Sequence, residues 1–402
     1  MMLESLADSA RTALGFFWKS GWAFVLGYSI SAMIQAFVPK ARLTRHMGTA
    51  GVKPVSLATV FGAISSSCSF AALSAARALV LKGAHFVAAV AFMFASTNLV
   101  IELGILIFIF LGWEFVVAEV IGGVIMIAIS AVLLVLTYPE SWLEAAREKV
   151  EEESAAEDQD FDWKKRIRSA EGWRRVGHNF VSEWKMVWEE IVIGFTVAGF
   201  VAVLVPASVW GSIFLLELQG SIPQWLIVLE NALVAPFVAA ATFIGSMGNI
   251  PLATVLNANG VLFAGIMGFI YSDLIVPPLV AVNARYYGLR VALYIAAVMY
   301  VSMVSTALIL HMGYATLGIT PESARVVEEV TRFAIDYTFW LNLAMVFVAA
   351  WMVWLHRRFL ATDMGGDGME MGGGSRLKRG AAWTAVTVVV TGATIWLTGL
   401  GG

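Results

Sequence analysis

The chain has 402 residues, of which 59% are hydrophobic and 14% are charged, and its mean hydropathy is +0.79. A soluble domain carries about 25% charged residues, so the composition excludes an ordinary soluble protein and indicates a multi-pass protein of the cytoplasmic membrane. The net charge of −3 offers no basic surface for nucleic acid. The single cysteine, Cys68, excludes an internal disulfide and a multi-cysteine metal site. We expect no cofactor and no bound metal.

Ten apolar segments follow one another along the chain, and each has about 18 residues or more, enough to cross a bilayer. They cover residues 20–38, 54–81, 84–111, 114–138, 186–206, 225–257, 260–283, 290–313, 334–355 and 381–400. No removable signal peptide is expected before the first one, because Met1–Ser20 lacks a basic start and a short apolar stretch. The charged stretch 139–184 and the glycine-rich stretch 364–379 are interpreted as a cytoplasmic connector and a flexible linker.

Two of these segments, 54–81 and 225–257, are too long and too interrupted to be plain spans. The interruptions are Gly62 with the run Ser65, Ser66, Ser67, Cys68 and Ser69 in the first, and Pro236 with Gly245–Pro251 in the second. Unwound or polar backbone at membrane depth is tolerated only inside protein or beside a water-filled cavity. Broken segments of this kind hold the substrate and ion sites of transporters, so the interruptions predict a transport function.

The basic residues favour a topology in which both broken segments are re-entrant hairpins that leave on the side they entered. In that arrangement 22 of the 26 Lys and Arg residues fall on one side of the membrane, and only Arg11, Lys19, Arg325 and Arg332 fall on the other. Cytoplasmic loops carry the excess of Lys and Arg. The sequence therefore predicts eight full spans, two hairpins and both termini outside.

The same topology predicts an all-α fold with an inverted repeat, in which residues 18–138 and 185–313 each run span, hairpin, span, span. A trace of the repeat is visible, because Gly83-x-x-Phe86-x5-Phe92 recurs as Gly260-x-x-Phe263-x5-Phe269, 177 residues later. Two extra spans in 331–402 follow. They either cover the lipid-facing side of the bundle or form an interface in a homo-oligomer.

The residues expected to bind substrate lie in the two interruptions and in the next segment. They are Ser65, Ser66, Ser67, Cys68, Ser69, Asn98, Gly248, Asn249 and Pro251. Hydroxyl, thiol and amide groups can bind a small solute, and glycine lets backbone approach it. The alternative for the small residues is tight helix packing.

Two carboxylates inside apolar segments, Glu102 and Asp273, are the candidates for proton or ion coupling, because a carboxylate in a membrane is a functional-site hypothesis by default. The alternative is a hydrogen bond that joins two helices. Pro277-Pro278, shortly after Asp273, should bend or end the helix. Asn98 and Glu102 are four residues apart, so on a continuous helix they share a face. Glu119 and Glu230 lie nearer segment ends, which favours a structural or interfacial role.

Together these residues resemble the predicted-permease superfamily that includes the ArsP organoarsenical efflux permeases, over roughly residues 18–313. The family's first repeat typically reads Cys-Ser-Cys-Gly, then a proline, then Lys-Gly-Ala. Here Cys68-Ser69-Phe70-Ala71 is followed by Ser74 at the proline position and by Lys82-Gly83-Ala84, while Asn249-Ile250-Pro251-Leu252 keeps the proline of the second repeat. The resemblance implies transport, and Phe70 leaves one thiol for a soft ligand where the family has two.

Three classes of function remain open. The leading hypothesis is a secondary permease that moves a small molecule or ion by alternating access. A channel would use the hairpins as a static pore, and a scaffold would act through the central cytoplasmic stretch. An intramembrane enzyme is least favoured, because no histidine accompanies the single thiol in the sequence.

Overall fold

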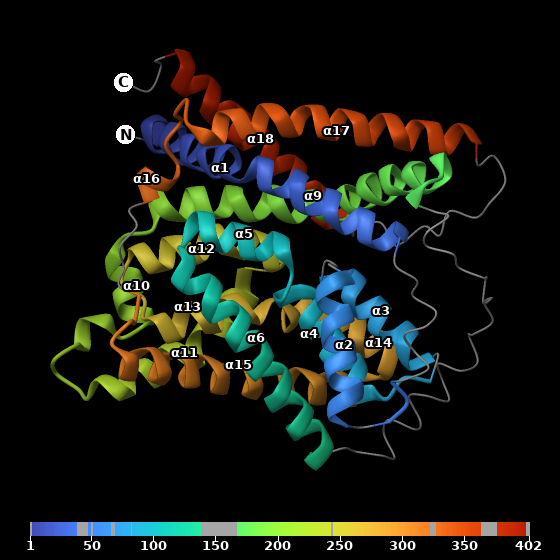
Figure 1. Ribbon diagram of the computed structural model, residues 1–402. Coiled ribbons are helices and arrows are strands. Elements are labelled where there is room, and N and C mark those ends of the chain that lie inside the picture. The colour runs from blue at the N-terminus through green and yellow to red at the C-terminus, as the bar shows by residue number, and fades with distance from the viewer. Residues whose placement is uncertain are drawn as a thin grey trace.

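The computed structural model describes residues 2–37, 47–49, 51–65, 69–81, 83–137, 167–242, 244–321, 327–362 and 376–398 (Figure 1). Within these ranges the chain is helical and forms no β-strand. The helices of the first half are α1 (Met2–Phe37), α2 (Val52–Ser65), α3 (Ser69–Leu81), α4 (Phe86–Asn98), α5 (Ile101–Phe110) and α6 (Trp113–Thr137). An all-α membrane fold is thus confirmed.

The second half begins with α9 (Ala170–Leu204), which is capped by the Ser169 hydroxyl accepting from Gly172 N–H. It continues with α10 (Ala207–Ile213), η2 (Leu216–Leu218), α11 (Gln224–Thr242), α12 (Ser246–Ala258), α13 (Phe263–Ile270), η3 (Tyr271–Leu274), α14 (Pro277–Tyr287) and α15 (Leu289–Leu317). The C-terminal part comprises α16 (Val327–Val330), α17 (Tyr337–Thr362) and α18 (Arg376–Thr398). The end of the expected central connector is therefore helical from Ala170, while 138–166 lies outside the described residues.

Seven helices in the described part are long and apolar enough to cross a membrane, or eight if the bent pair α4–α5 is one crossing. Eight is also the number of spans predicted from the sequence, but the two sets of helices differ. Helix α11, predicted to be part of a hairpin, is among the seven, and α1, predicted to be a span, is not. The polar residues of α1 explain its lower hydropathy. Ser31 and Gln35 donate hydrogen bonds to the buried carboxylate of Glu183 on α9, so these groups face protein.

The helix boundaries of the two halves match at a spacing of 177 residues. Helix α3 (69–81) corresponds to α12 (246–258), and both α4 and α13 begin at the matched residues Phe86 and Phe263. Gly83 and Gly260, three residues earlier, have φ values of +89° and +84°, a region in which glycine has no steric penalty. The recurring Gly-x-x-Phe motif therefore marks the same left-handed turn before the same helix in each half.

The helices form two groups (Figure 1). Helices α1, α9, α17 and α18 pack on one another in one layer, with both chain termini at the same end. The other group contains the remaining long helices of both halves, and in it α6 packs against α15. Helices α5 and α12 connect the groups, because α5 contacts α1 and α12 contacts α9.

Neither Gly62 nor Pro236 interrupts a helix, contrary to the sequence interpretation. Gly62 lies inside α2, where a Cβ would come within 2.5 Å of the Phe92 carbonyl oxygen, so this glycine serves close packing against α4. Pro236 lies inside α11, with its ring packed near Gly268 of α13. Neighbouring helices allow proline within membrane helices. The chain instead breaks after Ser65 and before Ser246.

Segment 84–111 is broken in the middle, which the sequence interpretation missed. Helix α4 ends at Asn98, Val100 is extended with φ −103° and ψ 145°, and α5 leaves at an angle of 41°. Asn98 and Glu102 therefore do not share the face of one continuous helix. The corresponding break in the second half, after η3, was expected from Pro277-Pro278, and it is present because Pro277 starts α14.

Candidate functional site

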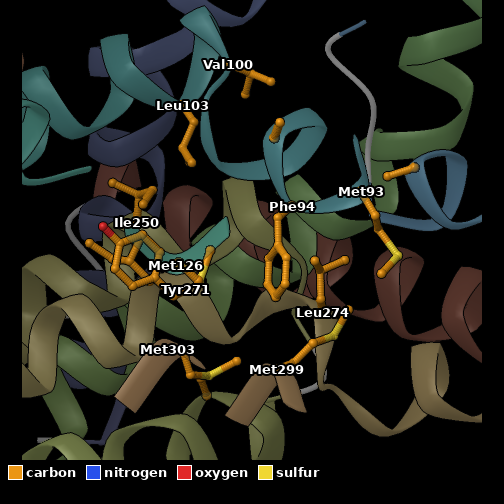
Figure 2. Packing of buried hydrophobic residues seen from close by; sticks show 14 of the residues in the cluster. Met93, Phe94, Val100, Leu103, Met126, Ile250, Tyr271, Leu274, Met299 and Met303 are labelled. Atoms are coloured by element: carbon orange, nitrogen blue, oxygen red, sulfur yellow. The ribbon is translucent and has the colours of Figure 1, made fainter. Parts of the chain in front are cut away.

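Three helix breaks of the two halves meet in the interior of the bundle. Figure 2 shows their neighbours in one view: Phe94 and Val100 flank the α4–α5 break, Ile250 lies in the first turns of α12, and Leu274 ends η3. Helix α12 contacts both α5 and η3. Polar groups at the breaks are thus held within apolar surroundings, where each of them is costly unless it is hydrogen-bonded.

A hydrogen bond joins two of the predicted site residues. Ser69, the first residue of α3, donates from Oγ to Asp273 Oδ2 of η3 over 2.9 Å, and both residues are fully buried. The other oxygen, Asp273 Oδ1, has no hydrogen-bond partner within the described residues. The bond connects Ser69, the last residue of the Ser/Cys run of the first half, to the carboxylate of the second half. The two residues are 204 positions apart in the sequence, so no sequence pattern predicts this hydrogen bond.

The start of α12 brings together Gly248 and Asn249, as predicted for the second interruption. Asn249 is fully buried, and neither its Oδ1 nor its Nδ2 has a hydrogen-bond partner in the described part of the chain. Gly248 packs on Gly194 of α9, where a Cβ would come within 3.2 Å of the Gly194 Cα. Pro251, also buried, lies inside α12. An amide without a partner in this setting is available to a ligand.

Glu190 of α9 is an acidic group that the sequence interpretation did not select. A Cβ at Gly245, the residue that caps α12, would clash with the Glu190 carboxylate, so the carboxylate lies directly against the start of α12. Glu190 also interacts electrostatically with Asp273. Glu190 lies within the apolar segment 186–206. The criterion that selected Glu102 and Asp273, a carboxylate inside an apolar segment, could therefore have selected Glu190 as well.

Asn98 and Glu102 lie on either side of the α4–α5 break. Asn98 donates to the Phe94 carbonyl over 3.2 Å, while its Oδ1 has no partner among the described residues. Glu102 is buried in the first turn of α5, and its side chain occupies the space beside Gly27 of α1. The two candidate coupling carboxylates, Glu102 and Asp273, therefore have different neighbours.

Three of the predicted residues, Ser66, Ser67 and Cys68, lie outside the described residues. Ser65 ends α2 and is half-buried. Within the described ranges no group of three His, Cys, Asp or Glu side chains could hold a metal ion. The described part of the candidate site consists of hydroxyl, amide and carboxylate groups at helix breaks.

Comparison with known proteins agrees with this arrangement. The sequence profile of the ArsP_1 family, described as predicted permease, matches residues 6–312. The chain belongs to this predicted-permease family. It is therefore a membrane permease with several transmembrane helices, and the resemblance found in the sequence motifs is confirmed.

One curated relative supports the same assignment. The chain is 36% identical over 350 residues to "Putative permease Rv2963" of Mycobacterium tuberculosis (strain ATCC 25618 / H37Rv), an alignment that covers 84% of each protein. No solved structure is significantly similar to the chain. The family match ends at residue 312, before α17 and α18.

Proposed function

We propose that this permease is a secondary transporter that moves a small solute by alternating access, with a proton or ion bound at Asp273 and Glu102 as the coupling step. The observation that carries the proposal is the buried hydrogen bond from Ser69 to Asp273. It places an ionisable group of one half against the interruption of the other half. A carboxylate in a membrane is costly, and such residues mark ion and proton pathways.

The matched helix boundaries support an inverted repeat. At the 177-residue spacing, α3 corresponds to α12 and α5 corresponds to α14. Contacts between the halves are reciprocal, because α3 contacts α14 and α12 contacts α5. Helices α6 and α15 also pack against each other, as do α1 and α9. A two-fold relation between halves, with broken helices at their interface, is a recurrent transporter architecture in which one half rocks against the other.

The short helices next to the interruptions support the re-entrant part of the proposal. Helices α2 and α3 have 14 and 13 residues, and α12 has 13. A transmembrane helix needs about 20 residues, so none of the three crosses a bilayer alone. Helix α11, with 19 residues, is long and apolar enough to cross a membrane, so the second proposed hairpin has one long helix and one short helix.

The packing around η3 is suited to movement. Four buried methionines, Met93, Met126, Met299 and Met303, come from α4, α6 and α15 and surround Tyr271 and Leu274 (Figure 2). Methionine is unbranched and fills irregular spaces, so it tolerates rearranged neighbours. A broken helix surrounded by such side chains can change its angle without leaving empty space.

The substrate class we propose is a small solute related to the metalloid compounds of the resembling exporters. The Cys68 thiol is a soft ligand of the kind that binds trivalent arsenic, and hydroxyl and amide groups such as those of Ser69 and Asn249 can bind polar groups of a solute. With one thiol, the soft contact is weaker than a pair would provide.

Transport by everted membrane vesicles tests the proposal, with a trivalent organoarsenical as the probe. We expect accumulation by the wild-type protein and loss of accumulation in Asp273→Asn at equal expression. Asp336→Asn is the matched control, because Asp336 lies before α17 and pairs with Lys19 at 3.0 Å, away from the helix breaks. Accumulation by Asp273→Asn at the wild-type rate would contradict the coupling role.

The vesicle assay distinguishes a carrier from a channel, and a cellular assay distinguishes both from a scaffold. A channel would give flux that does not saturate with probe concentration, whereas a carrier saturates because each cycle binds one load. A scaffold would lose its cellular function when residues 150–175 are deleted and would keep it when Ser69 or Asn249 is changed.

A further inference from the structure

Helices α3 and α14 pack together at one end of the bundle, and polar contacts join them across the boundary between the two halves (Figure 1). The guanidinium carbon of Arg77 on α3 lies 4.4 Å from the centre of the Tyr286 ring on α14. The hydroxyl oxygens of Ser74 and Tyr286 are 3.3 Å apart. One side chain of the second half, Tyr286, therefore contacts two residues of the first half.

These contacts lie at some distance from the Ser69–Asp273 hydrogen bond, along the two helices that begin beside it. Ser69 is the first residue of α3, and Asp273 lies in η3, which leads into α14. Arg77 follows Ser69 on α3 by a distance of about 12 Å, at 1.5 Å per helical residue. Tyr286 is the last residue but one of α14. The boundary between α3 and α14 thus starts at the candidate site, and Tyr286 joins its two sides near the helix ends.

The corresponding boundary, between α12 and α5, has a different composition. At the 177-residue spacing, the counterparts of Ser74, Arg77 and Tyr286 are Pro251, Thr254 and Ile109, and all three are buried. The Thr254 hydroxyl donates to the carbonyl of Ile250 in its own helix over 3.0 Å. Phe110, next to Ile109, is fully buried, and its ring centre lies 5.6 Å from that of Phe16. Apolar packing therefore closes this second boundary.

The two boundaries differ in what their separation would cost. Ser74, Arg77 and Tyr286 are only half-buried. A guanidinium over an aromatic ring and a pair of hydroxyls can part with each polar group hydrated, because long cationic side chains and tyrosine keep their polar ends near water. Separation of α12 from α5 would expose buried apolar side chains, which is unfavourable in water. The boundary between α3 and α14 is therefore the one that opens more readily.

We propose that Arg77, Ser74 and Tyr286 form a gate between the halves, through which the solute passes between the candidate site and the side of the membrane where α3 and α14 end. Lys82 and Arg285 follow or flank these helix ends, so the charge-derived topology predicts that this side is cytoplasmic. The use of the gate in a transport cycle rests on the proposed function. The control of access to the site by Tyr286 does not.

The rate at which Cys68 reacts with an impermeant thiol reagent, applied to one face of oriented vesicles at a time, tests the gate. Cys68 serves as the reporter because it immediately precedes Ser69. We expect Tyr286→Leu and Arg77→Gln to raise the rate from the predicted cytoplasmic face by about threefold, the change that loss of one exposed cation–π contact gives in an opening equilibrium. The rate from the other face should stay unchanged. Loss of a cation lowers the thiolate fraction of a nearby thiol, so a higher rate reports access.

Two variants serve as controls. Arg77→Lys keeps a cation over the ring and should label like the wild type. Arg285→Gln removes one positive charge from an exposed residue beside Tyr286 and should also leave the rate unchanged. Tyr286→Phe keeps the ring and loses only the contact with Ser74, so it should give a smaller increase even if Tyr286→Leu fails to fold.

Three results would overturn the gate. They are unchanged labelling in both Arg77→Gln and Tyr286→Phe, an equal increase from both faces, and a Cys68 that stays unreactive in every variant. Transport of the trivalent organoarsenical is measured separately in the same vesicles. Faster labelling from one face without any transport would support the gate and reject only the proposed function.

Discussion

Lys378 Nζ lies 2.6 Å from Glu190 Oε1, and this ion pair ties the start of α18 to the part of α9 that borders the candidate site. The Glu190 carboxylate also rests against Gly245, the cap of α12. Helix α18 lies beyond the residues that the family profile matches. The C-terminal helix α18 thus supplies a cation to the acidic group next to the start of α12. Arg379, the next residue, pairs with Glu189 at 3.4 Å.

The Lys378–Glu190 pair predicts a large loss of stability on removal of one partner. Lys378→Ala leaves a mostly buried carboxylate unpaired, and breaking a buried pair costs about 3 kcal/mol. The double variant Lys378→Ala/Glu190→Gln should recover most of this, because the charge is gone as well. Thermal unfolding of the protein in detergent measures the difference. Lys19→Ala is the control: it leaves Asp336 unpaired, but the Asp336 side chain is 34% exposed to solvent, so the change should cost less than about 1 kcal/mol. Equal losses for both variants would refute this account of the pair.

A matched pair of glycines tests the packing of α2 on α4. Gly62→Ala places a methyl group 2.5 Å from the Phe92 carbonyl oxygen and 2.7 Å from the Ala95 Cβ, and overpacking of this kind costs about 1–3 kcal/mol. Gly104→Ala in α5 has open space around the new Cβ, so better helix propensity should stabilise it by up to about 1 kcal/mol. Thermal unfolding midpoints should therefore move in opposite directions. A tolerated Gly62→Ala would mean that α2 and α4 are less closely packed.

The Ser69–Asp273 bond predicts different results for the substitution of two buried serines, Ser69 and Ser96. Ser69→Ala removes the donor to a buried carboxylate, at a cost of about 1–3 kcal/mol. Ser69→Thr keeps the hydroxyl and should retain most of the stability. Ser96, which matches Asp273 at the 177-residue spacing, donates over 3.0 Å to the Met93 carbonyl in its own helix. Ser96→Ala should therefore have a small effect, and unfolding midpoints that rank Ser96→Ala as the more damaging change would contradict the assignment.

The sequence predicted features that depend on local chemistry. Pro277-Pro278 indicated the break after η3, since proline is tolerated in the first turn of a helix but disrupts its interior. The Gly83 and Gly260 motif predicted matched starts of α4 and α13, because glycine adopts a left-handed turn without a steric penalty. The break at Leu99–Val100 has no proline or glycine, so only its packing reveals it.

Relationships between distant residues were beyond the sequence. Glu119 looked peripheral because it is near the start of its apolar segment, but Tyr271 and the packing of α6 place it inside. Glu190 is partnered by a lysine 188 residues away, and Asp273 by a serine 204 residues away. The periodicity of apolar residues in the sequence does not predict pairings between residues so far apart. Tertiary contacts also explain why α1 is not among the candidate membrane spans. Its polar residues Ser31 and Gln35 donate hydrogen bonds to Glu183 of α9, a pairing that the sequence does not show.

Labelling of the single cysteine in oriented vesicles tests the central claim most directly. Cys68 immediately precedes Ser69, the partner of Asp273, so an impermeant thiol reagent reports on access to the candidate site. Alternating access predicts that Cys68 reacts from one face of the membrane at a time. It also predicts that Asp273→Asn, which mimics the protonated carboxyl, changes the rate or the face of labelling while Asp336→Asn does not. Simultaneous labelling from both faces, or protection from both faces in wild type and variant at every pH, would contradict the account.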